Sequence, residues 1–130
     1  MTKIMQKNYR KDKFYPKVSK AIHAILENEN FVSPVEIFLK LEYLNKKDVE
    51  NWRFGRIPYL EKVIKCNLSK ANRILRILKF HAQDIDLKES HTVYKQWGKG
   101  KNRNILRFSK SHDKNVENAY STHFVRKNLK

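Results

Sequence analysis

The sequence has 130 residues, of which 40% are hydrophobic and 12% aromatic, and its formal net charge is +16. This length allows one ordinary domain and excludes two, and the apolar content excludes a wholly disordered chain. The only cysteine, Cys66, excludes an internal disulfide and Cys-rich zinc modules. Because no apolar run spans a bilayer and no apolar stretch follows the N-terminal lysines, we expect a soluble cytoplasmic protein.

Two helices are predicted in the first third of the chain. Pro16 is placed to begin the first, and apolar side chains follow it three and four residues apart. Ser33 begins the second, since Pro34 occupies the first helical position and Glu36 lies three residues after the cap. This spacing is that of a capping box, in which the cap and the third helical residue satisfy each other's backbone N–H groups.

Two further helices are predicted in the middle of the chain. Asn45 caps the third, and Gly55 and Pro58 interrupt it. Asn67 or Ser69 caps the fourth, which runs to about Gln83 with a clean division between an apolar and a basic face. The apolar face of this helix consists of Ala71, Ile74, Leu75, Leu78 and Ala82.

The last third of the chain changes from a helical to a strand-like pattern. Residues 91–97 and 104–110 are rich in β-branched and aromatic side chains and flank a polar turn, GKGKNR, which predicts a β-hairpin. Asp113 is placed to cap a closing helix. Its predicted inner face consists of Val116, Ala119, Tyr120, His123 and Phe124.

These elements predict a mainly helical single domain of the α+β class, with a C-terminal β-hairpin and a closing helix. The order of helices followed by a two-stranded wing is winged-helix-like. We expect a basic, flexible N-terminal arm over residues 1–14, the globular domain over residues 15–126 and a frayed tail over residues 127–130.

The positive charge is concentrated at the two ends of the chain. Residues 1–20 carry a net charge of +6 and residues 88–130 one of +8, whereas residues 21–87 carry only +2. A charge this far from zero destabilises a compact chain by self-repulsion, and it is typical of a protein with a polyanionic partner.

The fourth helix and the hairpin turn are the predicted contacts to that partner. Arg73, Arg76 and Lys79 follow one another at three-residue spacing, which suits successive phosphates. A solvated face on an otherwise buried helix is an equally good interpretation. The turn brings Lys99, Lys101 and Arg103 within five residues, beside glycines that allow a close approach.

The stretch NWRFGRIPYL, residues 51–60, mixes aromatic side chains with two arginines. We expect Trp52 and Phe54 to pack into the body of the domain while Arg53 and Arg56 share an outward face. The alternative is that Trp52 or Tyr59 is a platform on which unpaired bases stack, with an arginine adding a cation–π contact. The complete predicted set of nucleic-acid-binding residues is Arg53, Arg56, Lys70, Arg73, Arg76, Lys79, Lys99, Lys101, Arg103 and Arg107.

Histidines and carboxylates gather around the end of the fourth helix. His81, Asp84, Asp86 and His91 lie within eleven residues, and such groups could hold a divalent ion that activates water for phosphodiester cleavage. Their spacing matches no closed zinc pattern. We therefore expect no catalytic residues, metal or cofactor, and keep a metal-dependent nuclease as an alternative.

Four segments resemble those of a family of small uncharacterised bacterial proteins: WRFGRIPYLE, TVYKQWGKG, LRFSKS and YSTHFV. The resemblance covers most of residues 15–126 and implies one complete domain, but it brings no activity and no functional residue. The sequence as a whole predicts a non-enzymatic protein that binds DNA or RNA mainly through phosphates. The other hypothesis is a small interaction or inhibitor protein with an acidic protein partner; we expect no membrane partner.

Overall fold

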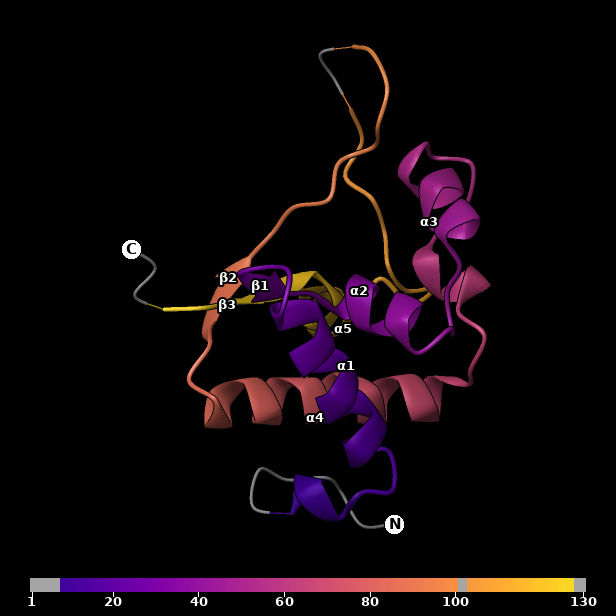
Figure 1. The fold of residues 1–130 in the computed structure, drawn as a ribbon. Coiled ribbons are helices and arrows are strands. Elements are labelled where there is room, and N and C mark those ends of the chain that lie inside the picture. Colours follow the sequence, from indigo (N-terminus) through magenta and orange to yellow (C-terminus); the bar gives the residue numbers. More distant parts are fainter. Residues whose placement is uncertain (1–7, 101–102, 128–130) are drawn as a thin grey trace.

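The computed structural model describes residues 8–100 and 103–127 (Figure 1). The helices are α1 (Tyr15–Leu26), α2 (Pro34–Lys40), α3 (Lys46–Arg53), α4 (Leu68–Asp84) and α5 (Lys114–Ser121). The strands are β1 (Phe31–Val32), β2 (Lys88–His91) and β3 (Thr122–Val125). Two short 3-10 helices are η1 (Tyr9–Lys11) and η2 (Leu60–Val63). The predicted α+β single domain is confirmed.

A small antiparallel sheet joins a segment from the first third of the chain to two segments from its last third. Its strand order is β1-β3-β2, so the last strand in the chain lies in the centre. Val125 pairs with Phe31 of β1 on one side and with Lys88 of β2 on the other. Burial alternates along β3, with Thr122 and Phe124 turned inward, as expected of a strand that has one covered face.

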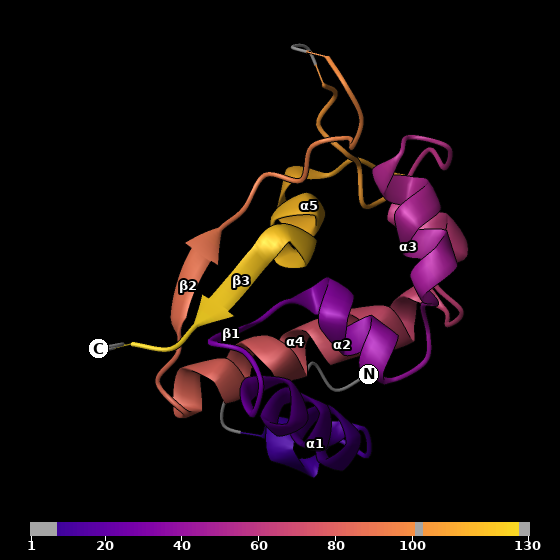
Figure 2. The same cartoon turned by 45° about the horizontal axis from the view of Figure 1, so that its top comes forward.

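Helices cover one side of this sheet. Helix α4 lies against α1, and η1 packs against both of them (Figures 1 and 2). A continuous core runs through these elements, and a cluster of aromatic rings extends it toward α3. Its largest fully buried side chains include Trp52, Tyr9, Tyr120, Phe38, Ile22 and Ile37.

The predicted helix starts are confirmed. The Ser33 hydroxyl accepts from the backbone N–H of Glu36, and the Glu36 carboxylate accepts from that of Ser33, which completes the capping box. The side chains of Asn45, Asn67 and Asp113 each accept a backbone N–H at the start of their helices. These contacts lie within four residues in the chain, which is why local sequence predicts them.

The predicted hairpin is only a short pairing. Its two arms meet at one isolated bridge between Lys95 and Ile105, and His91 belongs instead to β2. The second arm turns toward η2, where the carbonyl of Arg107 accepts from the backbone N–H of Leu60 and from Nε1 of Trp52. The two arms exchange backbone hydrogen bonds beside this bridge, from Gln96 to Asn104 and from Leu106 to Tyr94, but over the described residues they do not form the longer ladder of the expected two-stranded wing.

The closing helix is shorter than predicted. It ends at Ser121, and His123 and Phe124 lie on β3 rather than on its inner face. Residues 122–125 pair with strands on both sides, and these distant partners favour the extended conformation over a further turn of helix. Ala119, also predicted to face inward, is exposed, whereas Tyr120 is buried as expected.

The N-terminal segment is packed against the domain from residue 8 onward. The Tyr9 side chain is only 1% exposed and contacts the rings of Tyr15, Phe80 and His81. Residues 1–7 and 128–130 lie outside the described part of the chain, as do positions 101 and 102. The arm predicted over residues 1–14 therefore includes a packed portion over residues 8–14.

The two tryptophans provide a test of the core. Trp52 is fully buried and donates its Nε1–H to the Arg107 carbonyl at 2.8 Å, whereas Trp97 is 40% exposed. Trp52→Phe should lower the free energy of unfolding by about 1–3 kcal/mol, because it leaves a cavity and removes one of the two hydrogen bonds that the Arg107 carbonyl accepts. Trp97→Phe should change it by less than about 1 kcal/mol. Urea unfolding measures both, and equal losses would contradict the assigned burial.

The capping box makes stability depend on pH. Burial and the nearby Glu29 raise the pKa of Glu36 to about 7 from its ordinary value of 4.5. A raised carboxyl pKa adds stability below pH 4.5 that is lost as the pH rises through about 7. Glu36→Gln keeps the capping geometry but cannot ionise.

This variant should therefore match the wild type near pH 4 and exceed it by about 1 kcal/mol at pH 8, after allowance for solvent screening. Urea unfolding across this pH range measures the difference. Parallel stability curves for the two proteins would rule out a contribution from Glu36 ionisation.

Candidate functional site

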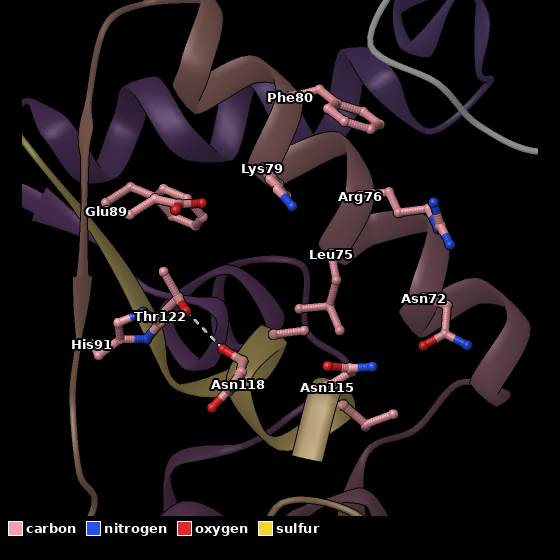
Figure 3. Close-up of a pocket in the computed structure, with 13 residues that line it drawn as sticks. Asn72, Leu75, Arg76, Lys79, Phe80, Glu89, His91, Asn115, Asn118 and Thr122 are labelled. Atoms are coloured by element: carbon pink, nitrogen blue, oxygen red, sulfur yellow. Dashed lines mark hydrogen bonds between the residues drawn. The ribbon is translucent and has the colours of Figure 1, made fainter. Parts of the chain in front are cut away.

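A polar groove lies between α4, α5 and the two strands β2 and β3 (Figure 3). Its volume is about 660 Å³. Apolar side chains from α4, α5 and β3 contribute Leu75, Phe80, Val116, Ala119 and Phe124 to its lining. Polar and charged side chains complete it: Asn72, Arg76, Lys79, Glu89, His91, Asn115, Asn118 and Thr122.

Two cations of α4 line this groove. Arg76 and Lys79 are one helical turn apart and exposed. Within the described residues neither forms an ion pair or a hydrogen bond, so their charge is not neutralised by the fold. Asparagine amides on α4 and α5 add further donors, and Glu89 of β2 contributes a single carboxylate. The lining therefore suits an anionic ligand.

The neighbouring cations of α4 have structural partners. Arg73 forms a two-pronged ion pair with the nearly buried Asp12, at 3.0 Å from Nε and 2.9 Å from Nη2. Lys70 lies over the rings of Phe14 and Tyr43. Both were predicted as phosphate contacts, but the structure uses them to hold residues 12–14 against α4. Asp12 lies 61 residues from its partner Arg73, too far for helix spacing to reveal the pair.

The stretch at residues 51–60 forms a corner that is only partly core. Trp52 is buried as predicted, but Phe54 is 41% exposed, so the expectation that both pack into the body is wrong for Phe54. The reason is local: Phe54 follows the last residue of α3, and Gly55, with φ of 77°, turns the chain away there. Phe54 instead meets Trp97 edge to face, with ring centroids 5.5 Å apart.

The two arginines of this corner lie against aromatic rings. The guanidinium of Arg53 lies over Tyr94 and Trp97, at 5.1 and 4.7 Å from the ring centroids. Arg56 lies 5.0 Å from the centre of the Phe54 ring and donates to the Asn51 side chain. Burial lowers the pKa of Arg53, and its Nε has no hydrogen-bond partner among the described residues.

The cations of the turn lie far from α4. The loop that carries Lys99 and Arg103 projects from one end of the molecule, and α4 crosses the other end (Figures 1 and 2). Lys99 and Arg103 are exposed, and Lys101 lies outside the described residues. Arg107 is turned back onto its own segment and donates to the carbonyls of Ser109 and Lys110. The predicted binding residues therefore do not form one continuous surface.

The structure divides the histidine and carboxylate group. His81 and Asp84 both meet the hydroxyl of Tyr9, Asp86 pairs with Lys127 at 2.8 Å, and His91 lines the groove. Across residues 8–100 and 103–127, no three His, Cys, Asp or Glu side chains are placed to hold a metal ion. The nuclease alternative gains no support from this part of the chain.

His81 belongs to a directed chain of hydrogen bonds. The Tyr9 hydroxyl donates to Asp84 at 2.6 Å, so it accepts from Nδ1 of His81 at 3.0 Å and from Nε of Arg10 at 3.1 Å. Nε2 of His81 then accepts from Nε2 of His23 at 3.1 Å. Burial lowers the pKa of His81, and His23 and Arg10 lower it further. The lowered pKa favours the neutral form of His81. Sequence patterns carried no signal for Tyr9 or His23.

Comparison with protein-family models, with curated proteins and with solved structures finds no match. The resemblance to a bacterial family therefore stays a prediction. In the described ranges, no helix has both the length and the apolar composition that a membrane span requires.

The chain of hydrogen bonds predicts loss of stability in acid. Below the ordinary histidine pKa of 6.5, the unfolded chain takes up a proton that buried His81 resists, so the unfolding free energy falls. His81→Gln should flatten the fall between pH 6.5 and the lower folded pKa, although His123, whose pKa burial also lowers, preserves part of it. The control is His91→Gln, at an exposed position. Identical slopes in all three proteins would contradict a buried neutral His81.

Proposed function

We propose that this chain binds nucleic acid, and that it contacts the phosphate backbone through Arg76 and Lys79 beside the groove and through the basic loop at residues 98–103. The observation that carries the proposal is the pair of exposed α4 cations that the described part of the fold leaves without partners, in a chain of net charge +16. Phosphates supply the opposite charge and release condensed counterions on binding.

The contrast along α4 supports a ligand on the groove side. On one side of the helix, Arg73 and Lys70 are occupied by Asp12 and by aromatic rings. On the groove side, Arg76 and Lys79 have asparagine amides beside them and one carboxylate, Glu89, in the same lining. Amides and cations are the usual donors to phosphate oxygens.

The distance between the two basic regions limits the shape of the ligand. Because α4 and the loop that carries Lys99 and Arg103 lie at opposite ends of the domain, only a ligand that spans the domain would meet both of them (Figure 1). A flexible strand could reach both. The proposal treats the groove as the main phosphate contact and the loop as a second one.

A pair of double variants tests the groove. Arg76→Gln with Lys79→Gln should weaken binding and reduce the slope of log K against log salt by about 0.7–0.9 for each phosphate that is no longer neutralised. Lys17→Gln with Lys20→Gln is the matched control, since both are exposed, three residues apart and on α1. It removes the same charge from another surface. Fluorescence anisotropy with labelled DNA and RNA across a salt series measures the slopes.

Equal effects of the two double variants would show that only net charge matters and would remove the groove from the proposal. Absence of binding to every nucleic acid near physiological salt would overturn the proposed function. In that case an acidic protein would become the leading partner class, because the same cations would recognise carboxylates.

A further inference from the structure

The aromatic corner at the C-terminal end of α3 is a second candidate binding surface, separate from the groove. It consists of Phe54 and Trp97 with Arg53 and Arg56, and we name it the aromatic platform. A hydrogen bond of 2.6 Å from the backbone N–H of Trp97 to the Arg53 carbonyl fixes the loop to α3. The four side chains come from segments more than forty positions apart, which explains why the sequence alone did not assemble them.

We propose that the aromatic platform stacks on unpaired bases of single-stranded nucleic acid. Phe54 and Trp97 are 41% and 40% exposed, although large aromatic side chains usually contribute to a core. Every nucleobase has a flat π-face that such rings can cover, whereas a duplex buries these faces in its own stack. The proposal rests on the proposed function and adds that the bound nucleic acid is single-stranded.

The platform is held in position before a ligand arrives. The Arg53 guanidinium lies 4.7 Å from the centre of the Trp97 ring, and Arg56 lies 5.0 Å from that of Phe54. Phe54 and Trp97 also hold each other edge to face. Rings that are already ordered lose little conformational freedom on binding, so more of the stacking energy appears as affinity.

The positive charge around the platform suits a single-stranded nucleic acid, which carries phosphates, better than a purely apolar partner. Arg53 and Arg56 belong to it, and Lys99 follows Trp97 by two residues on the exposed loop. A base stacked on Trp97 would therefore bring its own phosphates close to cations. No carboxylate lies in the adjoining cavity of about 340 Å³, whose described lining includes Trp52, Tyr94, Trp97 and His123 beside Arg53.

The test separates stacking from apolar contact at one position. Trp97→Leu keeps apolar bulk but removes the ring, and Trp97→Phe keeps a ring. For a labelled thymidine oligonucleotide, Trp97→Leu should weaken binding about 5- to 150-fold, the range expected for loss of one stacked base. Trp97→Phe should recover most of the affinity. Leu68→Ala, at another exposed apolar position, is the control and should have no effect.

Two further ligands make the test specific. Trp97→Leu should leave unchanged the affinity for an oligomer of abasic sites, which carries the same phosphates without bases, and for duplex DNA. In the wild type, the thymidine oligonucleotide should quench tryptophan fluorescence. Trp97→Phe should remove the quenching, because Trp52, the other tryptophan, is fully buried.

The outcomes distinguish this inference from the proposed function. If the wild type binds the oligonucleotide and the Arg76/Lys79 double variant weakens it, but Trp97→Leu does not, the platform is excluded while the function stands. If Trp97→Leu weakens the abasic oligomer equally, stacking is excluded. If the wild type binds none of the ligands, both proposals fail.

Discussion

The arrangement of this domain depends on the central position of β3. Thr122–Val125 is the last strand of the chain, yet it pairs with β1 from the first third and with β2 from the last. The pairing with β1 joins residues about ninety positions apart, so its loop-closure cost must be offset by the core that it encloses. Because α5 leads directly into β3, the same pairing places α5 opposite α4 and so creates the groove.

The cations of α4 divide in a similar way into those that stabilise the fold and those that are available to a ligand. Much of the basic character of α4 serves the fold, since Arg73 and Lys70 hold the segment around Asp12 and Phe14. Arg76 and Lys79 do not take part in this. A helix with one uniformly basic face therefore carries two kinds of cation, and the difference comes from a segment that precedes the helix by more than fifty residues. Mutational tests that neutralise the whole face would confuse stability with binding.

The features predicted well from the sequence are those decided within a few residues. The caps at Ser33, Asn45, Asn67 and Asp113 depend on side chains that reach backbone groups of the next turn. The apolar face of α4 follows from helical spacing, and the burial of Trp52 follows from the general preference of large aromatic side chains for the core.

The features predicted poorly are those decided by distant partners. Residues 122–125 are strand because two other strands lie beside them, and the second hairpin arm is bonded to Trp52 and η2 as well as to the first arm. Phe54 and Trp97 lie together because the backbone of Trp97 bonds to that of Arg53 at the end of α3, and no periodicity connects these two segments. The fold class could thus be predicted without knowing which strands pair. The aromatic platform could not be predicted, because it depends on a contact between two distant segments.

The buried Tyr9 and the ion pair of Asp12 with Arg73 have a practical consequence for choosing a shorter form of this protein. A shorter form that began at residue 15, where the sequence pattern of the domain begins, would lack Tyr9 and Asp12. It would lose the hydroxyl that bonds to His81 and the carboxylate that neutralises Arg73. Such a truncated protein would expose an apolar strip of α1 and α4 and gain an unpaired cation beside it. The truncated protein would then bind polyanions more tightly than the full chain does, and it would be less soluble.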